Sequence, residues 1–394
     1  MTDQNFPQSD DASKQPLPET RYPCETCGAV LKFSPTTGTL ECKHCGHQQN
    51  IAASVKPIKE HNFRKALAEL ANANPISSDL VTIKCPTCAS QSQLTPGTHA
   101  GQCTYCGTPL IVDAALIKPF QPESLLPFKV TEKQALQFFR KWLGSLWFAP
   151  SALKKYASGD SRLQGLYVPY WTYDSDTQTS YSGRRGDVYH VRQNYTTNVN
   201  GRQVTRSRSV PRIRWTPANG HVSRHFDDVL IGASQTLPRQ ISNRLGPWDL
   251  VNLTAFDAAY LSGFDSEIYQ VDLDSGFEQA RLVMDQTIRT DIRRQIGGDQ
   301  QQIHQLQTHH SRTTFKSLLL PVWMAEFRFR DKTYRFAVNA RTGKTRGERP
   351  YSYLKIILAV ILGLIVTAAA VYLLSESGLL EQIQSTYFYQ ESIR

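Results

Sequence analysis

The sequence predicts an α+β protein with a metal-binding N-terminal region and one C-terminal membrane-spanning helix. Three observations support this prediction. Four Cys-x-x-Cys pairs lie within the first 106 residues, a strand-helix-strand-strand pattern occurs twice between positions 114 and 350, and an uncharged apolar run occupies positions 356–374. The composition, 40% hydrophobic and 20% charged, is that of a folded protein and excludes a chain that is disordered or multi-spanning throughout.

The eight cysteines are arranged as one pattern that occurs twice. The second two Cys-x-x-Cys pairs repeat the first two at an offset of 61 residues, and in each half fourteen residues separate the pairs. Each pair places two thiolates on one tight turn, and two pairs complete a tetrahedral site for a soft divalent ion. The pattern therefore predicts two tandem zinc ribbons holding two structural Zn²⁺ ions, with iron as the alternative metal. The expected ligands are Cys24, Cys27, Cys42 and Cys45 in the first site, and Cys85, Cys88, Cys103 and Cys106 in the second.

The region around these cysteines has the features of a cytoplasmic segment. Residues 1–20 have neither a basic start nor an apolar core, so we expect no signal peptide and no disulfide framework. His44 and His47 are alternative ligands at the first site, but four thiolates already complete it, which favours a solvent-facing role for both. A site closed by four ligands has no open position for metal catalysis.

The domain organisation follows from shifts in pattern and composition along the chain. We predict a disordered leader (1–20), a first zinc ribbon (21–50), a helical connector (51–80), a second zinc ribbon (81–113), a first α+β module with a basic insertion (114–235), a second module (236–350), a transmembrane helix (355–374) and an external tail (375–394).

The first module begins with a strand-like run, LLPFKV. A capping box formed by Thr131 and Gln134 then starts a helix that we expect to extend through Phe148. The next strand, GLYVPYWTY, contains Pro169, which predicts a position near a sheet edge.

The second module repeats this order. The strand IYQVDL is followed by a helix expected from Phe277 to Ile296, and then by the strands LLLPVWMAEFRFR and TYRFAVNA. Pro169 and Trp171 recur as Pro321 and Trp323, 152 residues later. This repeat predicts a duplicated strand-helix-strand-strand module in which each antiparallel sheet is covered by its own helix.

The run Ile356 to Leu374 predicts a single membrane span. At 1.5 Å per residue its nineteen residues reach about 28 Å, close to the thickness of a bilayer core. Six basic residues from Arg335 to Lys355 precede it and only Arg394 follows, so we expect a cytoplasmic N-terminal part of net charge +12 and an external tail of net charge −2. Ala359, Gly363 and Thr367 form a small-residue face through which the span could self-associate.

A basic segment interrupts the first module. It contains a single acid, Asp187, and eight arginines: Arg184, Arg185, Arg192, Arg202, Arg206, Arg208, Arg212 and Arg214. Interleaved aromatic residues suit nucleic-acid binding, alternating arginines suit lipid phosphates, and a simple solvated strand face is the third reading.

The sequence has no recognisable catalytic set. Gly343-Lys344-Thr345 lacks the first glycine of a phosphate-binding loop and is not followed by an apolar helix. Zinc-protease, nucleophile-elbow and dinucleotide-binding patterns do not occur either. We therefore expect a protein that is not an enzyme.

Several further segments resemble one family of bacterial membrane proteins. These are the two ribbons, PYWTYD at 169–174, FDDVLIGAS from Phe226, YLSGF at 260–264, LLLPVW at 318–323 and GERPYS at 347–352. The chain is similar to the family with paired transcription-factor-IIB-type (TFIIB-type) zinc ribbons, often labelled primosomal or replication-factor-Y-like. The resemblance implies a bacterial inner-membrane location and association with SPFH-domain and phage-shock-protein-A-type partners. It implies no helicase activity, because this chain lacks a nucleotide site.

Together these features predict a non-enzymatic, single-pass scaffold or adaptor that recruits cytoplasmic proteins to the inner membrane. Its expected partners are anionic lipid at the cytoplasmic face and proteins of the two classes that the resemblance implies. The alternative is a membrane-tethered, nucleic-acid-binding zinc-ribbon protein.

Overall fold

The computed structural model of the chain describes residues 22–52, 57–72, 82–84, 91–93, 98–103, 108–111, 121–150, 163–199, 202–329, 332–348 and 351–376. Within these residues the chain is an α+β protein, as the sequence predicts. Its C-terminal helix is apolar.

The described elements are five α-helices and sixteen strands. The helices are α1 (Phe63–Ala71), α2 (Glu132–Gly144), α4 (Arg239–Leu245), α5 (Leu273–Ile296) and α6 (Tyr353–Glu376). The strands are β1 (Lys32–Ser34), β2 (Thr39–Glu41), β3 (Gln48–Gln49), β4 (His61–Asn62), β5 (Thr82–Lys84), β6 (Gln91–Gln93), β7 (Thr98–Gln102), β8 (Pro109–Ile111), β9 (Ser124–Leu125), β10 (Gln164–Val199), β11 (Arg202–Gly232), β12 (Thr254–Ala255), β13 (Asp265–Glu267), β14 (Gln300–Phe329), β15 (Lys332–Asn339) and β16 (Thr345–Gly347).

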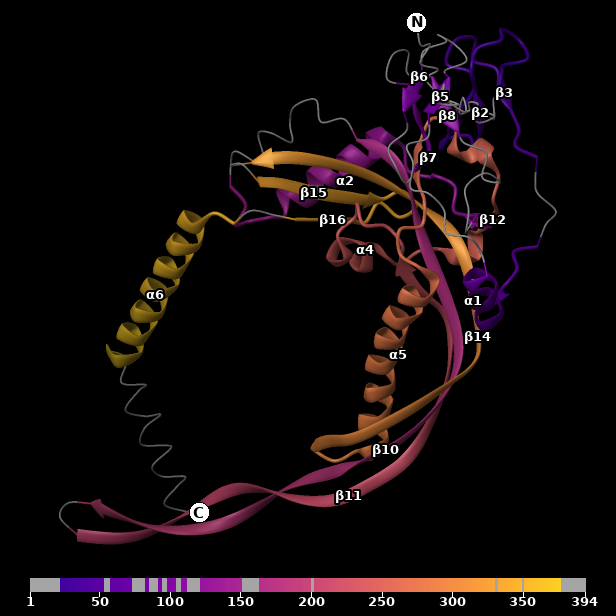
Figure 1. Ribbon diagram of the computed structural model, residues 1–394. Helices are drawn as coiled ribbons and strands as arrows, with labels where there is room; N and C mark the ends of the chain where they lie inside the picture. Colours follow the sequence, from indigo (N-terminus) through magenta and orange to yellow (C-terminus); the bar gives the residue numbers. More distant parts are fainter. Residues whose placement is uncertain are drawn as a thin grey trace, which may run out of the picture.

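One large sheet organises the body, with the central order β12-β9-β14-β10-β13-β7-β8. β10 and β11 form a long antiparallel hairpin that curves away from the body, and α5 lies along its concave side (Figure 1). The two modules therefore do not form separate antiparallel sheets, as the sequence analysis expected. They share one sheet, and two short parallel pairings, β9 with β14 and β13 with β10, join them.

The sequence repeat appears in the sheet as an internal two-fold relationship. β10 and β14 pair antiparallel with Val168 opposite Leu320, two positions that the 152-residue repeat makes equivalent. Pro169 lies opposite Leu319, and its equivalent Pro321 lies opposite Tyr167, the equivalent of Leu319. The repeats thus pair about a local dyad, in the way that two subunits pair in an isologous dimer.

The two equivalent tryptophans of the repeat, Trp171 and Trp323, each bond to the other repeat. The indole N–H of Trp171 donates to the carbonyl of Val271 at 2.9 Å, and that of Trp323 donates to the carbonyl of Val130 at 2.8 Å. Each acceptor directly precedes the N-cap of the other repeat's helix, α5 and α2 respectively. Each repeat therefore fixes the starting point of its counterpart's helix.

The two strand prolines also have equivalent surroundings. The carbonyl of Pro169 accepts from the Ala233 amide at 2.9 Å, and that of Pro321 accepts from the Ala340 amide at 3.0 Å. β10 is an interior strand, so the expectation that Pro169 marks an edge is wrong. The proline is tolerated because it lies where the ladder to β11 ends, one residue before Tyr170 pairs with Gly232.

Several expected element bounds differ from the structure. In the run LLPFKV only Leu125 is in a strand; the amides of Lys129 and Val130 both donate to the carbonyl of Ala340 instead. The first helix ends at Gly144 and not at Phe148. The run IYQVDL is not a strand; the strand that precedes α5 is β13, and α5 begins four residues before Phe277.

Helix α5 covers the hairpin through its buried side. Met284, Ile288 and Ile292 belong to the same apolar cluster as Trp171 and Tyr173 of β10. Two further clusters lie beneath α2 and α4. The body therefore has three packed regions on one sheet, and the hairpin extends beyond all of them.

Candidate metal centre

The first cysteine unit is built from two turns with the same hydrogen bonds. The Cys24 amide donates to the Ala29 carbonyl at 2.7 Å, and the Cys42 amide donates to the His47 carbonyl at 2.8 Å. The amides of Gly28 and Gly46 donate back to the carbonyls of Cys24 and Cys42 at 2.8 and 2.9 Å. Both glycines have positive φ, +73° and +75°, which explains their place directly after the second cysteine of each pair.

These turns bring four thiols together. The ligand atoms of Cys24, Cys27, Cys42 and Cys45 all lie within 4.8 Å of one another. The Sγ atoms of Cys24 and Cys45, and those of Cys27 and Cys42, are 3.5 Å apart. Metal–sulfur bonds of about 2.3 Å in tetrahedral geometry need sulfurs roughly 3.8 Å apart, so the group fits one metal ion.

The surroundings shift the pKa values of the four thiols in different directions: those of Cys24 and Cys42 are lowered and those of Cys27 and Cys45 are raised. A backbone hydrogen bond from Cys45 is the main cause that lowers the pKa of the Cys42 thiol to about 6; desolvation opposes it, and a backbone hydrogen bond from His44 adds to it. A thiolate is the form that binds metal. Neither His44 nor His47 belongs to the ligand group found among the described residues.

The second cysteine set lies mostly outside the described residues. Cys85, Cys88 and Cys106 are not described, so the second site stays a prediction. Cys103 is described and buried, and its amide donates to the Thr108 carbonyl at 2.8 Å. Cys24 and Cys42 make the same bond, from the cysteine amide to the carbonyl five residues later.

The first metal unit is fused to the body. The Phe33 amide donates to the Ser262 carbonyl at 2.9 Å, and the Ser262 hydroxyl donates to the Leu31 carbonyl at 2.6 Å. The Phe33 ring packs against Tyr260 and Phe264, with centroids 5.3 and 6.3 Å away. These contacts fix the first cysteine unit to the body.

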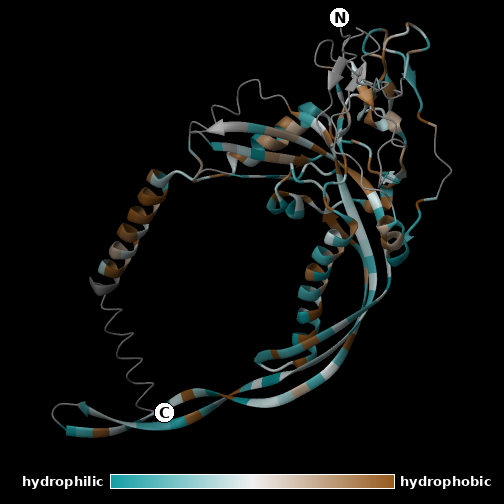
Figure 2. Cartoon of the chain, viewed as in Figure 1, coloured by the Kyte–Doolittle hydropathy of each residue, from teal (hydrophilic) through white to brown (hydrophobic). Residues whose placement is uncertain are grey.

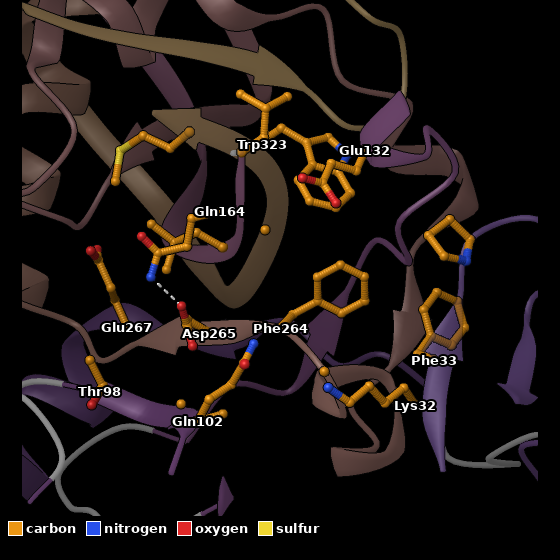
Figure 3. A pocket seen from close by; sticks show the side chains of 18 of the residues that line it. Lys32, Phe33, Thr98, Gln102, Glu132, Gln164, Phe264, Asp265, Glu267 and Trp323 are labelled. Atoms are coloured by element: carbon orange, nitrogen blue, oxygen red, sulfur yellow. Dashed lines mark hydrogen bonds between the residues drawn. The ribbon is translucent and has the colours of Figure 1, made fainter. Parts of the chain in front are cut away.

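A cleft of about 1210 Å³ separates this metal unit from the sheet. Figure 3 shows that its lining comes from β1, β7, β13 and the start of β10. Asp265 and Glu267, which lie two residues apart on β13, both line it. Gln164 donates to Asp265 through its side-chain amide, and burial raises the pKa of the Asp265 carboxyl.

Glu267 is the unusual group in this cleft. The residue is only 5% exposed, and its Oε2 has no hydrogen-bond partner among the residues that the structure describes. The aromatic residues Phe264 and Trp323 line other parts of the cleft. Two acidic groups beside aromatic walls can hold an organic cation, such as a lysine or arginine side chain. Asp265 and Glu267 were not predicted as a site from the sequence, where their only signal was two acids at alternate positions of one short strand.

A second acidic group, on the hairpin, is partly balanced by one lysine. The carboxylates of Asp174, Asp227 and Asp228 lie within 4.8 Å of one another. The ammonium of Lys316 is 2.7 Å from Asp228, and Thr314 donates to Asp174 at 3.1 Å. The same ammonium also lies 3.2 Å from Glu60, so it balances only part of the negative charge of this group.

The other predicted segments also have definite places. All eight arginines of the basic segment lie on β10 and β11, in or beside the part of the hairpin that extends beyond α5. Gly343-Lys344-Thr345 forms a turn in which the Lys344 ammonium donates to the carbonyl of Gly246. Residues 353–373 of α6 are long and apolar enough to cross a membrane, with none of that length buried, and Figure 2 shows their hydrophobic character.

Comparison with known proteins gives one similar chain. The uncharacterized protein YdjG of Bacillus subtilis (strain 168) is 24% identical over 334 residues, which cover 84% of this chain and 90% of that protein. No family model matches this sequence. No solved structure matches it either.

Proposed function

We propose that this chain is a non-enzymatic scaffold of the bacterial inner membrane that recruits cytoplasmic proteins. α6 would cross the bilayer once, with the basic N-terminal side in the cytoplasm. The four thiolates of the first unit would hold a structural Zn²⁺ ion, because zinc favours closed tetrahedral thiolate sites in the reducing cytoplasm. A second Zn²⁺ would occupy the other cysteine set, and Gly363 would lie on the face for self-association of the span.

The observation that supports recruitment most directly is the carboxylate of Glu267. A buried carboxylate oxygen without a donor, as Oε2 is here, destabilises the folded body unless a cation or other donor meets it. The cleft is open to solvent and wide enough for an extended peptide segment. A basic side chain of a partner protein would supply the donor that Oε2 lacks, provided that the wall of the cleft moves enough to uncover this buried atom.

The partner classes come from the family resemblance. SPFH-domain and phage-shock-protein-A-type proteins are the candidates, which would place the scaffold in membrane-stress or remodelling complexes. The fused metal unit suits this role because it forms one rigid wall of the cleft.

The test is capture of these two protein classes by the full-length chain, purified from membranes in mild detergent. Glu267→Gln removes the buried charge and keeps the side-chain shape. We expect capture to weaken at least 30-fold, the usual effect of removing one member of a buried charge pair at an interface. Glu69→Gln is the matched control, because it removes one exposed charge from α1 and should leave capture unchanged.

Metal content reports on folding in the same samples. Both variants should retain the zinc of the parent protein, and Glu267→Gln should raise the free energy of unfolding by about 1 kcal/mol because an unpaired buried charge is gone. Equal capture by both variants would show that the cleft does not recruit these proteins. Less than one metal ion per chain after gentle purification would contradict the zinc assignment.

The alternative function is a membrane-tethered nucleic-acid-binding protein, and the arginines of the hairpin favour it. In that case the purified chain would bind DNA or RNA, with an affinity that falls steeply as salt rises. Capture of a protein through an apolar or cleft contact would change far less over the same range of salt.

A further inference from the structure

The distal arm is the part of the β10–β11 hairpin that no other described element pairs with or packs against. β14 pairs with β10 only as far as Gly186, and α5 ends at Ile296, close to Gly183. Beyond this point thirteen residues of each strand, 187–199 and 202–214, pair only with each other. At about 3.3 Å per residue the distal arm is about 40 Å long.

The pairing register sorts the side chains of the distal arm onto two different faces. Residues directly opposite each other in an antiparallel pair lie on the same face, and faces alternate along each strand. Asp187 pairs with Arg214, Tyr189 with Arg212, and Gln193 with Arg208. One face, here named the arginine face, therefore holds five arginines of the distal arm: Arg202, Arg206, Arg208, Arg212 and Arg214.

The opposite face is almost uncharged. Serine, threonine and asparagine fill six of its twelve positions, its apolar members include Val188 and Ile213, and Arg192 is its one arginine in the distal arm. The one acid of the arginine face, Asp187, is held by Arg185 of the same face at 2.9 Å. The arginine face of the distal arm thus carries five arginines and a single acid, which gives it a net positive charge.

The arginine face also carries exposed apolar side chains. Tyr189, Val191 and Val204 are large, exposed and on this face. The guanidinium groups of Arg208 and Arg214 lie over the rings of Tyr195 and Tyr189, at 5.6 and 5.1 Å. Figure 2 shows the distal arm as mostly hydrophilic with a few apolar positions between.

We infer that the arginine face lies on the phosphate headgroups of an anionic bilayer. Arginines match headgroup phosphates, and the interleaved tyrosines and valines suit the headgroup boundary, where apolar side chains leave water. Binding to nucleic acid phosphates would give those exposed valines no such role. The inference rests on the proposed membrane anchoring of this chain, because the span keeps the distal arm near lipid.

The test compares two pairs of substitutions that remove the same charge. Arg208→Gln with Arg212→Gln alters the arginine face, and Arg184→Gln with Arg192→Gln alters the opposite face; all four residues are exposed. Each full-length protein is placed in phosphatidylcholine nanodiscs and mixed with vesicles of phosphatidylcholine and phosphatidylglycerol (roughly 3:1), and binding is measured by flotation. Each arginine near an anionic surface contributes about a 5-fold change in affinity, so the first pair should weaken binding about 30-fold and the second pair much less.

Three controls make the result decisive. Pure phosphatidylcholine vesicles should not bind, and binding to anionic vesicles should fall as salt rises because the charges are exposed. Equal losses for the two pairs of substitutions would overturn the inference, since net charge alone would then explain binding. It would also be overturned if the parent chain ignored anionic vesicles, or if the first pair abolished binding to a DNA duplex and left vesicle binding intact.

The outcome is independent of the recruitment test. The recruitment test depends on Glu267 in the cleft, whereas the lipid test depends on arginines of the distal arm. A chain that captures its proteins but ignores anionic vesicles would retain the proposed function and lose only this inference.

Discussion

The two halves of the β10–β11 hairpin use the same backbone ladder for different purposes. In the half next to the body, Trp171, Tyr173 and Phe226 are buried beneath α5. In the distal half the same face of the ladder carries Tyr195 and arginines and is open to solvent. The face changes from apolar to basic where α5 ends, at Ile296.

This difference shows that the pairing register alone does not decide what a strand face does. The covering helix turns one stretch of the face into core, and its end leaves the next stretch free to bind something else. Stability should therefore depend on side chains near the body, and binding on side chains of the distal arm.

The largest expected effect comes from the covered half. Trp171→Ala removes a fully buried ring and the hydrogen bond to Val271, and should lower the free energy of unfolding by about 3–5 kcal/mol. Urea unfolding of the detergent-solubilised chain, followed by circular dichroism, measures this change. A loss below about 1 kcal/mol would mean that α5 does not pack on the hairpin as described.

A smaller effect tests the close approach of α5 itself. A Cβ atom at Gly276 would meet the hydroxyl of Tyr173 and would lie 3.0 Å from Cδ1 of Trp171. Gly276→Ala should therefore destabilise the protein by about 1–3 kcal/mol, although alanine favours helices by about 1 kcal/mol. Gly144→Ala at the end of α2 is the control, because nothing lies within 4 Å of its Cβ position. Equal stability of the two variants would contradict the close approach of α5 to Tyr173 and Trp171.

The crosswise bonds of the repeats give a third, paired prediction. Trp171→Phe and Trp323→Phe each leave a ring in place and remove one indole N–H from a backbone carbonyl. Each substitution should lower the free energy of unfolding by about 1–2 kcal/mol. The two losses should be similar, because the local dyad makes the two sites equivalent. A large cost at one site and none at the other, in the same unfolding assay, would contradict that equivalence.

The sequence predicts those features of the fold that depend on local pattern. The repeat was visible as Pro169-x-Trp171 and Pro321-x-Trp323, and the capping box at Thr131 is present. The sharing of one sheet was not predictable, because the crossed bonds join residues about a hundred or more positions apart. The length of the hairpin was not predictable either. A strand that runs from a buried region into solvent does not keep one alternation of apolar and polar residues along its whole length.

The grouping of the four cysteines at the first site was predictable because it is encoded in their spacing. The Cys24-x-x-Cys27 turn needs only local geometry and a glycine with positive φ at position 28. Glu267 was not predictable, because its importance comes from burial by β7 and β10, which pair with β13 from distant parts of the sequence. Asp265 and Glu267 were visible as two acids at alternate positions, but the sequence carries no sign that one of them would be buried without a donor.

The smallest effect is expected in the distal half, and it completes the comparison. Tyr195→Ala removes a ring that the guanidinium of Arg208 overlies and that belongs to no buried apolar cluster of the described residues, so it should change the free energy of unfolding by at most about 0.5 kcal/mol. Tyr181→Ala is the matched contrast, because Tyr181 lies on the same face of the same strand but is only 7% exposed beneath α5; it should cost about 3 kcal/mol. If Tyr195→Ala destabilised the protein as much as Tyr181→Ala, the distal arm would be packed against something in the native protein. Binding to anionic vesicles should show the reverse order, since Tyr195 is on the arginine face and Tyr181 is covered.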